Sequence, residues 1–276
     1  MAIVVNTNVT SLLAQNDLTT NQAGLTQAME RLSSGLRIND AADDPAGLAI
    51  AVSMTQTIGA LNQGVQNGNN GVSLVQTTEG AMNDITNLLQ QMSTIASQAA
   101  TGTYSSSQLG NLNTTFGTLL NEIERVAQTA NFNGIDLLNG TTSSVSIQVG
   151  SNNTTNDSIT ISLSNLTTGS SGLNISTLDV SSNSDASTAI GDLQTALNTV
   201  TTALAKAGAN EVNLNAAVNN DSSTSANLSA ARSRIQDADY AAESSNLSRY
   251  NILTQANIAM LSQANALPSM ALQLLQ

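Results

Sequence analysis

Apolar residues recur along the chain at the spacing of a helix face. The first run is Leu18, Leu25, Met29, Leu32 and Leu36. Its steps of seven, four, three and four place these side chains on one stripe of a helix. Gly35, Asp43, Pro45 and Gly47 then interrupt the pattern. Because Gly and Pro end helices and Asp often caps the next one, we expect an irregular segment at about 36–47.

Two further runs predict a pair of long helices. The longer run fits a heptad register in which the apolar positions are Leu61, Val65, Val72, Val75, Met82, Leu89, Met92, Ala96 and Ala99. The other run alternates steps of three and four at Leu109, Leu112, Phe116, Leu119, Ile123, Val126 and Ala130. Turn residues at 102–107 separate the two runs, which favours an antiparallel pair.

Glycines within the longer run have two possible explanations. They are Gly59, Gly64, Gly68, Gly71 and Gly80. Each destabilises a helix interior by about 1 kcal/mol relative to Ala. Either the helix is broken there, or another helix or subunit approaches closely. The pattern leaves both explanations open.

The middle of the chain changes from helical to strand periodicity. After 132–134, apolar residues alternate with polar ones at Val145, Ile147 and Val149, and again at Ile159, Ile161 and Leu163. Alternation at period two predicts two strands of a hairpin. From 141 to 185, 21 of 45 residues are Ser or Thr, which is typical of a small, solvated module.

Helical spacing returns in the last third of the chain. A third core helix is predicted by Ile190, Leu193, Leu197, Val200 and Leu204. The final segment carries large apolar residues on both sides of its helix and no charge after Arg249. Because so apolar an end is unstable in water alone, we expect the two ends to pair with each other and with neighbouring copies. A contact between identical subunits that does not close produces an open helical polymer.

Composition narrows the classes of function. Only 2% of residues are aromatic, and Trp, His and Cys are absent, which favours helix seams over a wide core. The seven Lys and Arg residues form no tract and the formal net charge is -12, so nucleic acid binding is not expected. The N-terminal residues resemble no cleaved signal, and no stretch is long and apolar enough to span a membrane. No cofactor is expected.

An enzyme and a membrane-active helix are the alternative classes. The chain has no His or Cys for acid-base or nucleophilic chemistry, and no phosphate-binding glycine loop. Asp43, Asp44, Asp237 and Asp239 could form pairs of carboxylates, but acidic residues near helix ends are usually caps. A membrane-active helix at 247–276 is disfavoured because it has no cation beyond Arg249.

Several motifs resemble those of the bacterial flagellin family. In the N-terminal half they are RLSSGLRIN at 31–39, QTTEGA at 76–81, LNEIERV at 120–126 and FNG at 132–134. In the C-terminal part they are SRIQDADYA at 233–241, NLSR at 246–249 and QAN at 263–265. The resemblance covers about residues 1–140 and 186–276. It implies a flagellar filament subunit that is exported through a type III channel; the alternative is a hook-filament junction protein.

The resemblance also implies an architecture. The expected fold is mainly α: a long antiparallel helical bundle or coiled coil with paired N- and C-terminal helices and a small outer module that contains a β-hairpin. The expected divisions are an inner-tube segment at 1–44, the helical core at 45–140 and 186–235, the outer module at 141–185, and the C-terminal inner-tube helix at 236–276. Inner-tube packing is expected from Leu13, Leu18, Leu25, Leu253, Leu261, Leu267, Leu272 and Leu275.

Partners and contact residues follow from the same resemblance. The partners are copies of the chain, the export machinery, an export chaperone at the C-terminus, and cap and junction proteins, in an extracellular flagellum. The candidate subunit contacts are Arg31, Leu32, Arg37, Asn39, Asp43, Arg125, Arg232, Arg234, Asp237 and Asp239. For 36–47 the alternative is a plain loop that joins two helices.

The resemblance also implies expectations for two further features, a receptor-recognition motif and a region that can carry O-linked sugars. The motif that a vertebrate innate receptor recognises reads Leu-Gln-Arg-Val-Arg-Glu-Leu in the family. The corresponding segment 89–95 keeps its apolar positions, such as Ile95, but has Gln91 in place of the first arginine, and Thr115 replaces a second family glutamate. We therefore expect poor receptor activation. O-linked sugars are a possibility at Thr141, Ser143, Ser146, Thr160 and Ser170, and plain solvated loops are the alternative.

Overall fold

The computed structural model describes residues 7–152 and 154–273, with side chains described up to residue 267. Two compact units divide the chain. The terminal unit combines the beginning of the chain, up to Gln56, with residues from Asn227 onward, and the central unit is Thr57–Ala226. The expected fold class is confirmed, because long helices dominate and the strands form only small antiparallel pairs.

Long helices make up most of residues 7–152 and 154–273. They are α1 (Val9–Ser34), α2 (Pro45–Ala99), α3 (Ser106–Thr129), α4 (Asn183–Gln236) and α5 (Tyr240–Gln273). Asn8 caps α1 by accepting a hydrogen bond from the Ser11 amide, and Gly35 ends it at a φ of 73°. Ser105 and Gln108 form a reciprocal capping box at the start of α3. The irregular segment expected at 36–47 lies between α1 and α2.

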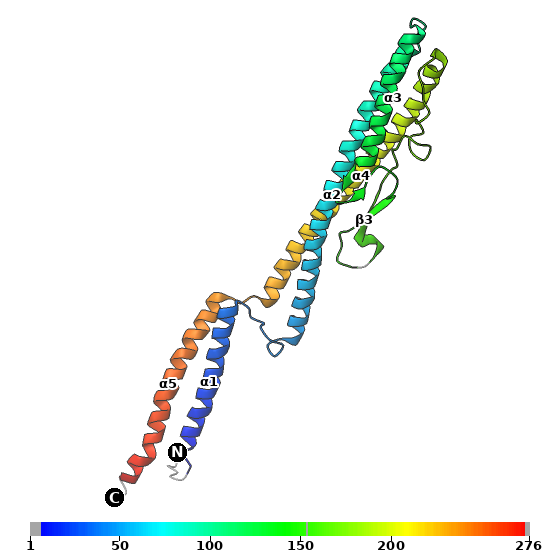
Figure 1. Ribbon diagram of the computed structural model, residues 1–276. Coiled ribbons are helices and arrows are strands. Elements are labelled where there is room, and N and C mark those ends of the chain that lie inside the picture. Colours follow the sequence, from blue (N-terminus) through cyan, green and yellow to red (C-terminus); the bar gives the residue numbers. More distant parts are fainter. Residues whose placement is uncertain (1–6, 153, 274–276) are drawn as a thin grey trace. The chain divides into compact units, whose positions relative to one another are not determined.

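The central unit is built around a seam between α2, α3 and α4, which run side by side in Figure 1. Phe116 and Ile123 of α3 are fully buried together with Met92 of α2 and Val200 of α4. Alanines occupy much of the remaining seam, which allows the helix backbones to approach closely. Seven of the nine heptad positions read from the sequence of α2 are buried, and the other two, Val65 and Val72, are half-buried.

Helix α2 continues without a break from Pro45 to Ala99, so a local break at its glycines is wrong. A Cβ added at Gly64 would overlap the carbonyl group of Val149, and one at Gly68 would overlap a methyl group of Val218. Close approach therefore explains these two glycines. Gly59 and Gly80 have nothing within 4 Å of an added Cβ, so their surroundings give no packing reason for glycine.

Two antiparallel hairpins complete the central unit. Strands β3 (Ser144–Gln148) and β4 (Ser158–Ser162) pair in the predicted hairpin, with Val145 opposite Ile161 and Ile147 opposite Ile159. A short 3-10 helix, η1 (Thr155–Asp157), precedes β4. The sequence reading missed the smaller pair β1 (Asn131–Phe132) and β2 (Ile135–Asp136). Asn133 and Gly134 form its turn with φ values of 51° and 80°, and this Asn-Gly pair was the available signal.

In the terminal unit, α1 and α5 pair along a seam of small and polar residues (Figure 1). Ala14 and Ala28 of α1 are buried there, as are Asn257 and Ala264 of α5. Gly24 leaves room for the Tyr250 ring, because an added Cβ would come within 2.5 Å of that ring. Small residues bring the two helices close together but bury little apolar area.

The fully buried Phe116 provides a test of the central seam. We expect Phe116→Ala to lower the free energy of unfolding by about 3–5 kcal/mol, because it removes buried apolar area and leaves a cavity. Denaturant unfolding followed by circular dichroism measures the change. The neighbouring exposed Thr115→Ala serves as the control and should stay within about 0.5 kcal/mol of the wild type. Equal effects of the two variants would contradict this packing.

Candidate functional site

Two short linkers of the terminal unit are hydrogen-bonded to each other. Residues 35–44 connect α1 to α2, and residues 237–239 connect α4 to α5. Leu36 and Asp237 form an isolated antiparallel bridge. The Arg37 amide donates to the Gln236 carbonyl at 2.6 Å, and the Ala238 amide donates to the Gly35 carbonyl at 2.9 Å. The loop at 36–47 is therefore fixed against the second linker.

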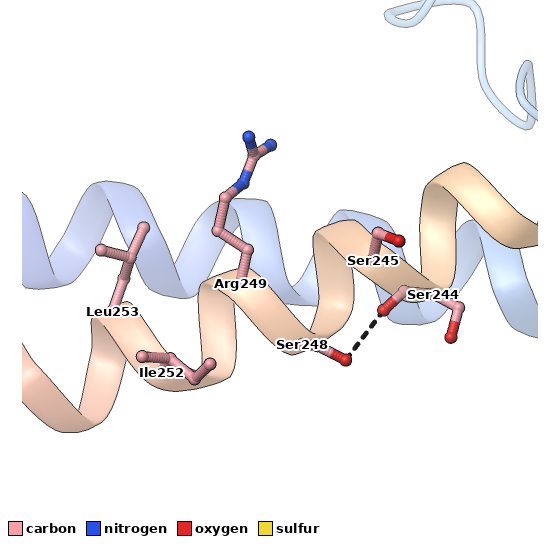
Figure 2. Close-up of a pocket in the computed structure, with 6 residues that line it drawn as sticks. All are labelled: Ser244, Ser245, Ser248, Arg249, Ile252 and Leu253. Carbon is pink, nitrogen blue, oxygen red and sulfur yellow. Dashed lines mark hydrogen bonds between the residues drawn. The ribbon is translucent and has the colours of Figure 1, made fainter.

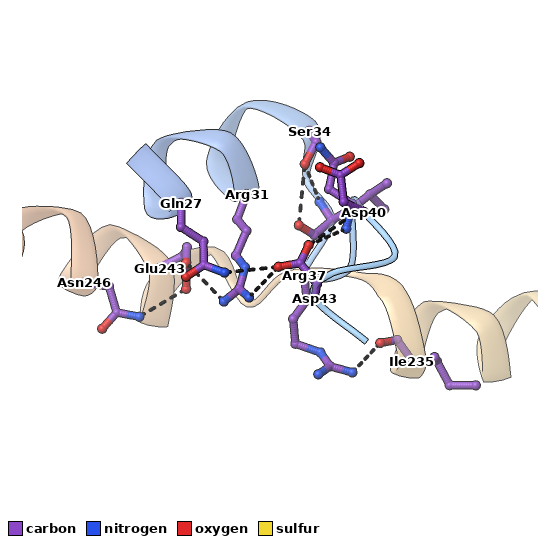
Figure 3. A network of polar contacts seen from close by, with 11 residues as sticks. Gln27, Arg31, Ser34, Arg37, Asp40, Asp43, Ile235, Glu243 and Asn246 are labelled. Carbon is purple, nitrogen blue, oxygen red and sulfur yellow. Dashed lines mark hydrogen bonds and ion pairs between the residues drawn. The ribbon is translucent and has the colours of Figure 1, made fainter. Parts of the chain in front are cut away.

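Arg31 joins three segments of this region (Figure 3). Its guanidinium lies 3.5 Å from Asp43 in the first linker and 3.6 Å from Glu243 in α5. Its Nε is buried and has no hydrogen-bond partner. Because Arg31 is the cation of both ion pairs, its loss would leave the buried Glu243 without its ion-pair partner.

Asp43 organises the loop around its carboxylate. Its Oδ2 accepts hydrogen bonds from the Asn39 amide at 3.1 Å and the Asp40 amide at 3.3 Å, and its Oδ1 accepts one from Gln27. The two backbone amides, assisted by Gln27 and Arg31, lower the pKa of Asp43 below its ordinary value. Hydrogen bonds to the charged form thus fold the turn that precedes α2.

Side-chain hydrogen bonds also join the linkers to the helices. Arg37 donates from Nη2 to the Ile235 carbonyl at 2.5 Å (Figure 3). Tyr240 donates its hydroxyl to the Leu32 carbonyl at 2.5 Å. Arg232 donates to the Thr55 hydroxyl at 3.1 Å, which joins the end of α4 to the start of α2.

The ten candidate contact residues are not all in one place. Nine lie in the terminal unit, in or beside the linkers, and Arg125 lies in the central unit, where it forms an exposed ion pair with Glu122 of the same helix. Asp239 accepts from the Ala241 and Ala242 amides and so caps α5, and Asp237 accepts from the Ser233 hydroxyl. The structure thus gives these two carboxylates local partners.

Large apolar side chains face outward from the α1–α5 pair, and we call them the outer apolar faces. On α1 they are Val9, Leu12, Leu13 and Met29; on α5 they are Ile252, Leu253, Ile258, Met260 and Leu267. Ile252 is the most exposed of them at 66%. The expected packing residues divide accordingly: Leu18, Leu25 and Leu261 are half-buried, whereas Leu13, Leu253 and Leu267 are exposed. The side chain of Leu272 and the whole of Leu275 lie outside what the structure describes.

A shallow hollow interrupts the outer apolar face of α5 (Figure 2). It is lined by Ser244, Ser245, Ser248, Arg249, Ile252 and Leu253. Arg249 also donates to Asn246 at 2.8 Å, and its guanidinium carbon lies 5.4 Å from the centroid of the Tyr250 ring. All the lining residues come from one helix, so the hollow is open to a second surface rather than enclosed.

The remaining candidate residues lie in the central unit. Gln91 and Thr115 are exposed and Ile95 is half-buried. The five hydroxyl residues Thr141, Ser143, Ser146, Thr160 and Ser170 are all exposed. Within residues 7–152 and 154–273, no helix has the length and hydropathy that crossing a bilayer requires. The described acidic side chains form no cluster of three or more that could hold a metal ion.

The terminal unit is a pair of helices with outer apolar faces and the central unit is a three-helix bundle, so the chain is a mainly helical protein of two units. The family model for the bacterial flagellin N-terminal helical region matches residues 5–143, and the model for the C-terminal helical region matches residues 190–275. The chain belongs to the bacterial flagellin family.

Individual relatives agree with this assignment. The flagellin of Halalkalibacterium halodurans is 37% identical over 274 residues, covering 99% of this chain and all of the relative. The crystal structure of Bacillus cereus flagellin matches 56% of this chain and 88% of its own with a TM-score of 0.51 and 27% identity. A putative flagellar hook-associated protein from Vibrio parahaemolyticus gives a TM-score of 0.58 over 71% of this chain and all of its own, but its 14% identity shows a shared fold alone.

The carboxylate of Asp43 makes the linker network sensitive to pH. Because its pKa is lowered in the folded state, its stabilisation is complete above the ordinary value of about 3.8 and is lost as the pH falls through the folded pKa. We expect Asp43→Asn to destabilise the turn by about 0.5 kcal/mol at pH 7, since the site is partly solvated. Hydrogen exchange at the Asn39 and Asp40 amides measures this change.

Asp40→Asn is the matched control, because it leaves the accepting carboxylate in place. The difference between Asp43→Asn and the wild type should shrink as the pH falls below 3.8 and through the lowered pKa of Asp43. If the Asn39 and Asp40 amides are equally protected from hydrogen exchange in the two variants at pH 7, the Asp43 carboxylate does not organise the turn.

Proposed function

We propose that this subunit of the bacterial flagellar filament polymerises through the outer apolar faces of α1 and α5. The observation that carries the proposal is that nine large apolar side chains remain exposed on these two helices. Exposed apolar area of this extent is costly in water, and burial against neighbouring copies would remove the cost. Side chains such as Leu13, Leu253 and Leu267 would then be buried only in the assembled filament.

The linker network would set the geometry of those contacts. Arg31, Arg37 and Asp43 hold 35–44 and 237–239 together, so a change in their hydrogen bonds would alter how the ends of α1 and α5 are presented. A filament that supercoils needs subunit contacts with two alternative arrangements. We assign that adjustable role to this region, with Leu32, Asn39, Arg232, Arg234, Asp237 and Asp239 around it, and we assign Arg125 to a separate contact on the central unit.

The same proposal includes the route and the partners. The chain would leave the cell through the flagellar export machinery, be met by an export chaperone at its C-terminus, and join cap and junction proteins at the filament. Its role would be structural rather than catalytic, which agrees with the absence of His and Cys from the sequence. The divisions expected at 1–44, 45–140, 141–185, 186–235 and 236–276 remain part of this proposal.

The outer apolar face of α5 can be tested by a double substitution. We expect Ile252→Ser with Met260→Ser to raise the subunit concentration needed for polymerisation by about 30-fold, because about 2 kcal/mol of apolar burial is lost. Sedimentation after seeding with filament fragments measures that concentration. Val212→Ser is the control, since Val212 is 68% exposed but lies on α4 in the central unit.

The double variant should keep the helical content of the wild type, because both positions are exposed. Unchanged polymerisation would contradict the assembly role of this face. A wild-type chain that never forms filaments alone would instead favour the hook-filament junction alternative.

The altered receptor motif gives a second test. We expect purified monomer to activate the vertebrate innate receptor poorly, because the family's arginines and glutamate supply charge-assisted hydrogen bonds that Gln91, Ser93 and Thr94 do not. The combined variant Gln91→Arg, Ser93→Arg and Thr94→Glu should lower the half-maximal dose in a reporter cell assay by about 10-fold or more. A potent response to the wild-type monomer would refute this expectation.

A further inference from the structure

Asp221 is a carboxylate buried at the place where the β3–β4 hairpin meets the bundle. It lies on α4, one turn after Val218, and only 7% of its surface is exposed. Its Oδ2 is buried and has no hydrogen-bond partner. A buried carboxylate oxygen without a donor is costly when it carries a charge. The fold must therefore offset this cost or avoid the charge.

The hairpin region packs against α2 and α4. The side-chain Nδ2 of Asn67 in α2 donates to the Gln148 carbonyl at 3.0 Å. Val149 rests on the glycine surface at Gly64 and Gly68, and Ile147 lies with Leu214 of α4 next to Gly71. At the mouth of the hairpin, the Val149 and Gly150 amides both donate to the Asp157 carbonyl at 2.9 Å. The hairpin end that carries Asp157 is thus held beside α4.

The segments that meet here contain no cation. Residues 57–78 of α2 have no ionisable side chain, and Asp221 is the only one in residues 212–231 of α4. The hairpin region, residues 141–164, contributes Asp157 alone. Asp221 therefore faces a second carboxylate and no positive charge.

We propose that Asp221 is a proton-operated latch for the β3–β4 hairpin. When Asp221 is protonated, the hairpin docks firmly on α2 and α4. When Asp221 is charged, its unpartnered oxygen and the repulsion from Asp157 loosen the docked hairpin. The outer module would thus become more mobile as the surroundings change from acidic to neutral.

The direction of the effect follows from the folded state. Burial, and then the negative charge of Asp157, raise the pKa of Asp221 above its ordinary value of 3.8. A group with a raised carboxyl pKa binds its proton more tightly in the docked state than in the undocked state. Docking is therefore favoured most below about pH 3.8, weakens as the pH rises through the folded pKa, and is constant above it.

Nuclear magnetic resonance of the full chain tests the latch. The carboxyl carbon of Asp221 should titrate above its ordinary range, and the hydrogen-exchange protection factors of the Val149 and Gly150 amides should fall by about tenfold between pH 4 and pH 7. In Asp221→Asn, the same protection factors should stay high across that range. Asp157→Asn should reduce the fall, because it removes the repelling charge.

Asp192→Asn is the matched control, an exposed carboxylate on the same helix. It should retain the full pH dependence of the wild type. The latch is overturned if Asp221 titrates in its ordinary range. It is also overturned if the fall in protection persists unchanged in Asp221→Asn. The direct titration of the wild-type carboxyl group decides the question even if a variant does not fold.

Discussion

A two-helix pair has one seam, and this constraint governs the terminal unit. Side chains on the facing stripes of α1 and α5 can be buried, and every other face of both helices meets water. In this chain the seam contains small and polar residues such as Ala14, Ala28 and Asn257, while the larger Leu13, Ile252 and Met260 point outward. The single subunit therefore leaves these large apolar side chains exposed, and we propose that neighbouring subunits bury them.

The central unit solves the same packing problem in a different way. Three helices enclose a shared seam, so Phe116, Ile123 and Met92 become fully buried without any partner chain. Because Gly64 and Gly68 of α2 have no side chain, Val149 of the hairpin region can lie close to this helix. This unit therefore has its own buried core.

Hydrogen bonds and ion pairs between the two linkers are the third structural feature that bears on function. Arg31 pairs with Asp43 and Glu243, and backbone bonds such as that from Arg37 to Gln236 hold the two linkers together. These polar contacts join segments that are far apart in the sequence, whereas buried apolar side chains hold the central seam together. Under our proposal, these bonds allow the linker region to adopt alternative arrangements in the filament.

The sequence by itself determined the helices, the β3–β4 hairpin, the irregular segment and the family, because periodicity and motifs are local properties of the chain. It could not determine which stripe of α5 is covered, since apolar residues occur on both sides of that helix. It also could not show that α2 continues through its glycines without a break. Nor could it show that Arg31 forms an ion pair with Glu243, or that Asp221 is buried near Asp157. Those facts depend on contacts between residues up to about two hundred positions apart, and only the tertiary structure brings such residues together.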